Sequence, residues 1–247
     1  MADQVTPPPG YRMQEICALA GPGAIVVALV GWLVAGVLPR PPAADDSTAD
    51  IVAFYGENPT AVRLGLALAV LGLSGIGALT AVISIRMVQM PGQSPVAAFL
   101  QMISGAVTWV MLIVPLVIMN VAAFRPDRTP ELTVTLNDLA WILFIPPVGP
   151  FLVQNVAIAV GILSDRGERP ILPRWVAFAN LWVGFLFLPG LLAYFFKSGP
   201  FAWQGIFSFW LALTAYAAWA FIMGFTIRAS LRREYAGSPA APATVDA

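Results

Sequence analysis

Residues 96–124 read VAAFLQMISGAVTWVMLIVPLVIMNVAAF and contain no Asp, Glu, Lys or Arg. A helix needs about 20 mainly apolar residues to cross a bilayer, because the hydrocarbon core is about 30 Å thick. The stretch is longer than this and carries only a few polar side chains. It therefore predicts a membrane-spanning helix.

The chain as a whole has the composition of a membrane protein. Of its 247 residues, 59% are hydrophobic and 11% are charged, and the mean hydropathy is +0.80, whereas soluble domains carry about 25% charged residues. The composition predicts an all-α, polytopic bundle of about six transmembrane spans. The five further apolar runs are 18–38, 64–85, 139–163, 175–196 and 201–227.

The six runs define one transmembrane domain between two tails. We expect a six-helix domain over residues 18–228, a cytoplasmic tail over 1–17 and a disordered cytoplasmic tail over 229–247, which is rich in Ala and Pro. The first run is too long for a signal peptide and leads into Pro39-Arg40-Pro41-Pro42 instead of a cleavage site of small residues. It is therefore counted as a span.

Basic residues are unequally divided between the two sides of such a bundle. Eight of the 13 fall on the side that also holds both termini. Because short cytoplasmic loops carry an excess of Lys and Arg, this bias predicts that the N-terminus and the C-terminus are both cytoplasmic. The eight are Arg12, Arg86, Arg166, Arg169, Arg174, Arg228, Arg232 and Arg233.

Two rare residue types limit the chemistry. The sequence has no His, which excludes imidazole-ligated haem, copper, zinc and di-iron sites. Cys17 is its single Cys, which excludes an intrachain disulfide and a thiolate cluster. We therefore expect no metal and no cofactor. The 13 basic and 13 acidic residues balance, so the charge does not favour nucleic acid as a partner.

Polar side chains within the spans are concentrated in the cytoplasmic half of the membrane. An unpaired polar group is costly in hydrocarbon, so these residues indicate either hydrogen bonds between helices or a polar-lined cavity that opens to the cytoplasm. Thr80 and Ser84 lie at this depth. The candidate ligand-binding residues are Gln101, Ser104, Thr108, Gln154, Asn155 and Asn180.

Prolines interrupt the spans in the opposite half of the membrane. Each one removes a backbone donor and kinks or breaks its helix. Two readings are open: tolerated kinks, or a discontinuous helix whose exposed carbonyls line a binding site, as in transporters. The candidate helix-breaking residues are Pro115, Pro146, Pro147, Pro150 and Pro189.

Charged and aromatic side chains form a candidate patch on the outer face. Trp141 and Trp203 are expected to belong to an aromatic belt at the membrane interface, and Asn137-Asp138 is expected to cap the fourth span. The patch consists of Arg125, Asp127, Arg128, Asp138, Lys197 and Trp203.

Six short segments carry a family resemblance. They are residues 53–55 (AFY), 122–128 (AAFRPDR), 137–141 (NDLAW), 173–175 (PRW), 180–182 (NLW) and 196–203 (FKSGPFAW). Together they resemble a family of uncharacterised bacterial, mainly actinobacterial, integral membrane proteins with six spans. The resemblance covers nearly all of the chain outside its tails. It implies a multi-pass protein of the bacterial inner (plasma) membrane and brings no catalytic assignment.

These observations leave three functions open. The leading hypothesis is transport or binding of a small neutral or lipophilic compound in a cavity between the third, fourth and fifth spans. The lack of an ionisable residue in the span cores weighs against an ion-coupled pump and against a catalytic residue. The second hypothesis is a non-catalytic subunit whose outer face docks another membrane protein or a second copy. The third is an intramembrane isomerase or cyclase that uses Asp138.

Overall fold

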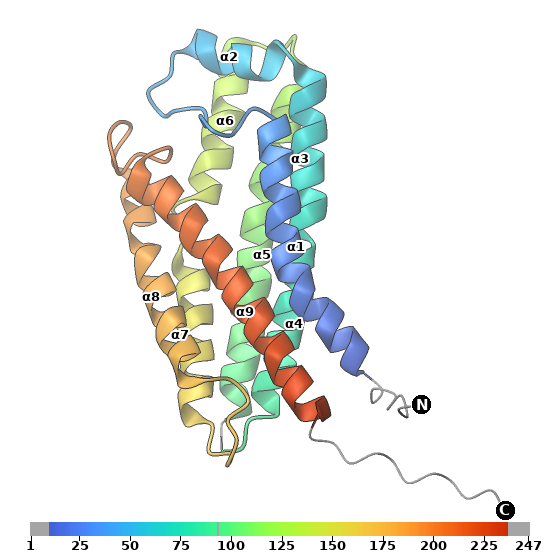
Figure 1. Cartoon of the computed structure of the whole chain (residues 1–247). Coiled ribbons are helices and arrows are strands. Elements are labelled where there is room, and N and C mark those ends of the chain that lie inside the picture. Colours follow the sequence, from blue (N-terminus) through green and yellow to red (C-terminus); the bar gives the residue numbers. More distant parts are fainter. Residues whose placement is uncertain (1–9, 93, 237–247) are drawn as a thin grey trace, which may run out of the picture.

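Helices, and no strand, form the regular structure of residues 10–92 and 94–236, the part of the chain that the computed structural model describes (Figure 1). Within it, six helical segments are long and apolar enough to cross a membrane. The prediction of an all-α six-span bundle is confirmed, and the chain is an integral membrane protein. The segments are Tyr11–Val34, Pro59–Val88, Pro95–Phe124, Pro130–Ser164, Arg174–Tyr194 and Ile206–Tyr235.

Several of these spans are interrupted helices. The first and third are the single helices α1 (Tyr11–Val34) and α5 (Pro95–Phe124). The short helix α2 (Thr48–Gly56) precedes the second span. The other spans each combine two elements: α3 (Pro59–Leu73) with α4 (Gly75–Val88), α6 (Pro130–Phe144) with α7 (Gly149–Ser164), α8 (Arg174–Leu186) with the 3₁₀ helix η1 (Leu188–Tyr194), and the π-helical turn η2 (Ile206–Trp210) with α9 (Leu211–Ala236).

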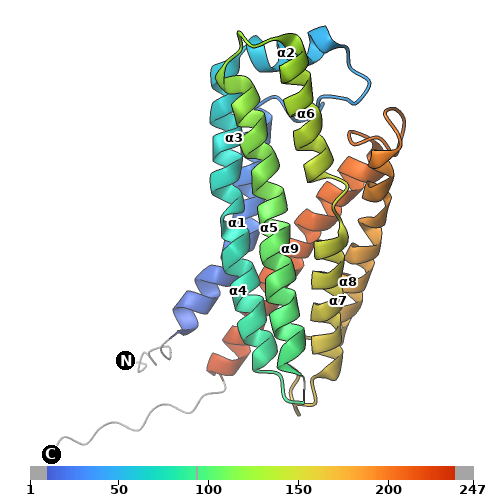
Figure 2. The same ribbon diagram turned by 180° about the vertical axis from the view of Figure 1, so that it is seen from behind.

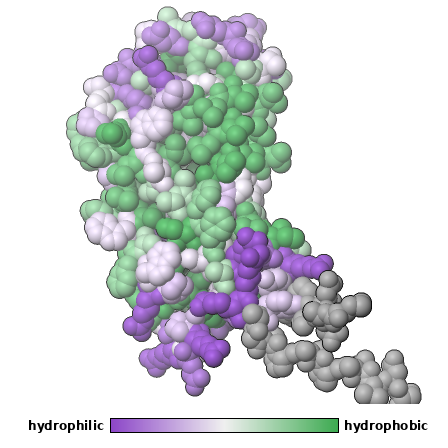
Figure 3. All heavy atoms as spheres, in the orientation of Figure 1, coloured by the Kyte–Doolittle hydropathy of each residue, from purple (hydrophilic) through white to green (hydrophobic). Residues whose placement is uncertain are grey.

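The two ends of the bundle differ in what they carry. Figures 1 and 2 show that α1 begins and α9 ends at one end, which we call the terminal end. At the opposite end, which we call the distal end, α2 lies across the tops of its neighbours. Apolar residues dominate the middle of the face in Figure 3, and hydrophilic residues gather toward the two ends. This distribution is the one expected of a chain that crosses a bilayer.

Some predicted boundaries need correction. Helix α1 already begins at Tyr11, and α9 continues to Ala236. Residues 11–17 and 229–236 are therefore helical, and Gly10 is the N-cap of α1. Residues 1–9 and 237–247 of the predicted tails lie outside the described part.

The fourth span also begins earlier than predicted, at Pro130 instead of residue 139. Pro130 in the first turn has a φ angle suited to a helix start, and the carboxylate of Glu131 favours the positive end of the helix dipole. The proposed cap at Asn137 and Asp138 is wrong, because both residues lie inside α6.

Helix α1 packs on its neighbours at backbone distance. A Cβ atom placed on Gly31 would lie 2.5 Å from the carbonyl oxygen of Gly65 in α3, and one placed on Gly224 in α9 would lie 2.6 Å from the carbonyl oxygen of Ala18. Both distances are shorter than van der Waals contact. Small residues thus allow α3 and α9 to approach α1 on two sides, as is common between transmembrane helices.

We predict that Gly31→Ala destabilises the protein while Gly23→Ala in the same helix does not. The added methyl group at 31 would force α1 and α3 apart, at a cost of about 1–3 kcal/mol. At Gly23 it would meet no atom within 4 Å, and the higher helix propensity of Ala would give up to about 1 kcal/mol of stabilisation. Unfolding in mixed detergent and dodecyl sulfate, followed by circular dichroism, measures both. Equal stability of the two variants would contradict the close approach of α1 and α3.

Candidate functional site

The fourth span is broken between Phe144 and Gly149, where α6 ends and α7 begins. Pro146 and Pro147 have no N–H, so neither can bond to the carbonyl one turn before it. The broken backbone is covered by the fifth span: a Cβ placed on Gly190 of η1 would lie 3.1 Å from the carbonyl oxygen of Ile145. Such cover is what hydrocarbon requires of non-helical backbone. Of the two readings, the helix is discontinuous at this proline pair.

The other three prolines have different roles. Pro115 lies inside the uninterrupted helix α5. Pro150 occupies the first turn of α7, and Pro189 occupies the first turn of η1, positions that tolerate a missing N–H. Pro115 therefore leaves its span unbroken, whereas Pro189 lies where the fifth span changes from α8 to η1.

A cavity lies between the helices beside this break, and we call it the interhelical cavity. Its volume is about 90 Å³, and it is partly open to the surroundings of the bundle. Its lining residues are Ile25, Ala28, Leu29, Trp32, Leu73, Thr108, Met111, Leu112, Phe144, Ile145, Pro147, Val148, Phe151, Phe187, Phe209, Ala212, Leu213 and Tyr216.

The lining is apolar and rich in aromatic rings, with three residues that carry polar side-chain atoms. The Thr108 hydroxyl donates to the carbonyl oxygen of Ser104 on its own helix, at 2.9 Å. Trp32 and Tyr216 are only 5% and 6% exposed, and the indole N–H and the phenol O–H find no hydrogen-bond partner among the described residues. None of the 18 lining residues is charged.

Five aromatic rings form a cluster between the cavity and the distal loops. Trp32, Phe144 and Phe209 line the cavity, and both Phe144 and Phe209 pack edge-on against Trp141. Trp141 stacks on Trp203, with ring planes 8° apart and centroids at 6.3 Å.

The cluster continues to the distal loop that follows α1, because the indole of Trp203 donates to the carbonyl oxygen of Pro42 at 2.9 Å. Trp141 and Trp203 are buried, so their assignment to an aromatic belt is wrong. Trp141 and Trp203 stack on one another inside the protein, and Trp141 also packs against phenylalanine rings, so neither lies at the membrane interface.

The predicted polar residues do not form one site. Gln101 donates to the carbonyl oxygen of Thr80 at 3.1 Å and to the hydroxyl of Ser84 at 3.2 Å, joining α5 to α4. Gln154 of α7 reaches the same region, because its amide lies 2.7 Å from where a Cβ on Gly105 would stand. These residues connect the second, third and fourth spans near the terminal end.

Two further amides lie apart from it. Asn155 donates to the carbonyl oxygen of Phe151, at 2.7 Å. Asn180 donates to that of Val176 at 2.8 Å and accepts from the indole of Trp219 at 2.9 Å. Of the six candidate ligand-binding residues, only Thr108 is among the cavity's lining residues. The interhelical cavity is therefore not lined by the predicted amides.

The predicted outer patch is divided as well. Arg125 and Asp127 are exposed in the turn between α5 and α6, with Arg128 half-buried beside them, while Lys197 is exposed in a separate loop and Trp203 is buried. Asp138 is exposed on α6 and accepts a hydrogen bond from Asn137 at 3.3 Å. The buried amide of Asn137 in turn accepts from the hydroxyl of Tyr55 at 3.0 Å, which ties α2 to α6.

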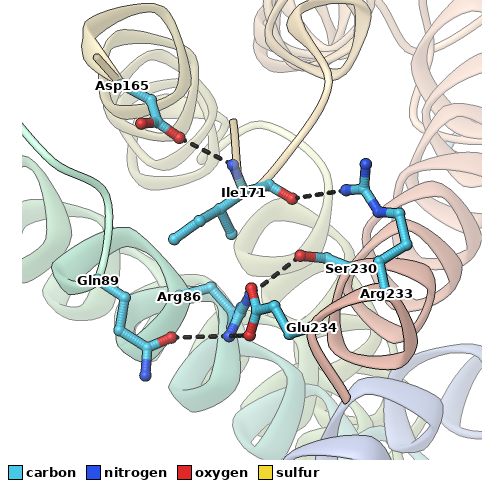
Figure 4. Close-up of polar contacts among 7 residues, drawn as sticks. All are labelled: Arg86, Gln89, Asp165, Ile171, Ser230, Arg233 and Glu234. Carbon is cyan, nitrogen blue, oxygen red and sulfur yellow. Dashed lines mark hydrogen bonds and ion pairs between the residues drawn. The ribbon is translucent and has the colours of Figure 1, made fainter. Parts of the chain in front are cut away.

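Sequence reasoning missed a buried ion pair at the terminal end. Arg86 of α4 is 2% exposed and pairs with Glu234 of α9, which is 52% exposed. The guanidinium also donates to Gln89 at 2.8 Å and to the hydroxyl of Ser230 at 2.9 Å (Figure 4). The pair could not be predicted from local sequence, because the hydrophobic runs place Arg86 in a loop and Glu234 in the C-terminal tail.

The same end holds the loop between α7 and α8. Asp165 accepts from the backbone N–H of Ile171 at 2.9 Å, and Arg233 donates to the carbonyl oxygen of Ile171 at 3.2 Å (Figure 4). Arg228 of α9 donates to Glu15 of α1 at 2.7 Å. Charged contacts thus fix α9 to α1, to α4 and to this loop.

No protein-family model, curated protein or solved structure matches the chain. The interpretation of the cavity therefore rests on its own residues and geometry.

We predict that Glu234→Ala destabilises the protein more than Arg86→Met. Removal of Glu234 leaves a buried guanidinium without its counter-charge, at a cost of about 2–3 kcal/mol. Arg86→Met removes that charge, keeps much of the buried aliphatic volume and leaves Glu234 half in water, at a cost of about 1 kcal/mol. The double variant should match Arg86→Met. Chemical unfolding of the three variants measures this order, and the reverse order would show that Arg86 is not a buried charge.

Proposed function

We propose that this membrane protein binds a small lipophilic compound in the interhelical cavity, as a transport or binding protein. The observation that carries the proposal is an uncharged, aromatic-rich cavity beside a broken span. Ligand pockets are mostly apolar with a few polar groups that fix orientation. The cavity has this composition.

The lining favours a neutral ligand over a charged one. A charged group that enters an apolar cavity loses its hydration and needs an opposite charge or several hydrogen bonds in return. The lining residues provide no ionisable side chain except the Tyr216 phenol, which is neutral near pH 7. An apolar compound gains from the same surface, because its own apolar area leaves water.

The cavity lowers the stability of the bundle when it is empty. Protein interiors are close-packed, and empty volume in a core is destabilising. The rings of Phe151, Phe187 and Tyr216 pack against one another along its wall, with centroids 4.5–6.2 Å apart. A bound ligand would offset the cost of the cavity by filling the space that these rings leave between them.

The broken fourth span favours a cavity whose shape can change, because its two halves can move separately. Helix α6 packs against α2 and α5, whereas α7 packs against α5 and α8. The two halves of one span thus have largely different neighbours, and residues 145–148 between them line the cavity in part. Discontinuous helices at binding sites are a recurring feature of transporters.

An enzymatic role for Asp138 finds less support. The carboxylate is exposed on α6 and is not among the residues that line the cavity. A general acid or base must reach the reacting group within hydrogen-bond distance, and Asp138 offers that reach only outside the cavity.

We predict that Ala212→Phe abolishes ligand binding and that Ala218→Phe leaves it unchanged. Ala212 lines the cavity, and Ala218 is exposed on the same helix, so the two variants add the same ring to different surroundings. Binding of the neutral fluorescent probe N-phenylnaphthylamine would be measured in lipid nanodiscs, with empty nanodiscs as the reference for partition into lipid. We expect a loss of at least about tenfold in affinity for Ala212→Phe.

Two results would contradict the proposal. One is a wild-type signal no larger than that of empty nanodiscs. The other is an equal affinity of the two variants, which would place the probe on the lipid-facing surface instead of in the cavity.

A further inference from the structure

Two residues that line the interhelical cavity carry buried donor groups and lie on neighbouring helices. Trp32 belongs to α1 and Tyr216 to α9, and both side chains are more than nine-tenths buried. The indole nitrogen and the phenol oxygen have no hydrogen-bond partner in the described part of the chain. A buried donor without an acceptor is unfavourable, so each group offers interaction energy to a ligand that supplies one.

The kind of partner they need follows from their chemistry. An indole N–H can only donate, and a phenol hydroxyl can donate as well as accept. The remaining polar side chain of the lining, Thr108, has already given its hydrogen to Ser104. The side chains of the cavity thus offer hydrogens to a ligand more readily than they accept them. A complementary ligand carries acceptor oxygens and need not bring hydrogens of its own.

The aromatic content of the cavity wall narrows the class of ligand further. Aromatic rings make up a third of the lining, namely Trp32, Phe144, Phe151, Phe187, Phe209 and Tyr216. Aromatic rings pack favourably against the faces and edges of other flat π-systems. A planar, unsaturated ligand would therefore contact more of this wall than a branched aliphatic one.

We propose that the ligand is a planar, neutral carbonyl compound whose oxygen accepts hydrogen bonds from Trp32 and Tyr216. This assignment rests on the proposed binding function and specifies the chemistry of the same cavity. Trp32 and Tyr216 are its specificity-determining residues, because they alone distinguish a carbonyl compound from a hydrocarbon of the same shape.

A matched pair of compounds tests the assignment. Acetylnaphthalene and ethylnaphthalene, substituted at the same ring position, have similar shape and differ by a carbonyl oxygen. Their affinities would be measured by displacement of N-phenylnaphthylamine from the full-length protein in nanodiscs, each corrected for its partition into empty nanodiscs. We expect the wild-type protein to prefer the ketone by about tenfold or more, because sites built to hydrogen-bond a ligand discriminate strongly against analogues that lack the group.

Conservative variants assign the preference to the two donors. Trp32→Phe and Tyr216→Phe each keep a ring and remove one donor, so each should lower the ratio of ketone to hydrocarbon affinity severalfold while ethylnaphthalene binding persists. Trp109→Phe is the matched control, since the indole N–H of Trp109 is also buried without a partner but Trp109 does not line the cavity. Its ratio should equal that of the wild type.

The possible failures are distinguishable. If the probe binds but the wild-type protein has equal affinity for both naphthalenes, the carbonyl assignment is wrong and the binding function stands. If neither the probe nor either compound binds, the binding function itself is wrong. The wild-type comparison requires no variant, so it decides the question even if Trp32→Phe fails to fold. An unchanged ratio in both folded variants would also overturn the assignment.

Discussion

The break at Pro146 and Pro147 is the constraint on which the rest of the distal half depends. In hydrocarbon, backbone that leaves the helix must be covered by protein or face a cavity. Both solutions are present here: Gly190 of η1 packs against the carbonyl of Ile145, and residues around the break line the interhelical cavity. The break also separates α6 from α7. The space between them and α1 and η2 is occupied by the rings of Trp32, Phe144 and Phe209 and by the cavity.

The cavity keeps its walls because α1 and α9 are held from elsewhere. Helix α1 touches α3 at Gly31 and α9 at Ala18 through backbone-level contacts, and the ion pairs of Glu15 and Arg86 bind α9 at the terminal end. Trp32 and Tyr216 therefore stand on helices that are braced outside the cavity. Binding sites on well-supported elements keep their donors in position when no ligand is bound.

Composition was sufficient to predict the six spans, and proline placement marked the fourth span as kinked or broken without deciding between the two. Hydrophobic runs report the length of a span, and a Pro-Pro pair cannot continue a helix, so both signals are local. The positions of Trp141, Trp203 and Arg86 could not be predicted in this way. A sequence gives the depth of a side chain along a span, but which neighbour it faces depends on how the spans pack around one another.

The same limit explains why the amides proved a poor guide to the cavity. Short polar side chains can bond to the carbonyl one turn back on their own helix, as Asn155, Asn180 and Thr108 all do. Such a residue satisfies part of its demand without any ligand. An indole N–H or a tyrosine hydroxyl lies too far along a rigid ring to reach its own backbone in this way, so it must find a partner on another element. Three buried donors of this kind do so, as the bonds from Tyr55, Trp203 and Trp219 show. The buried donors of Trp32, Tyr216, Trp109 and Trp141 have no partner among the described residues. Of these four residues only Trp32 and Tyr216 line the cavity, and this position, together with the missing partner, is why we propose a ligand for them.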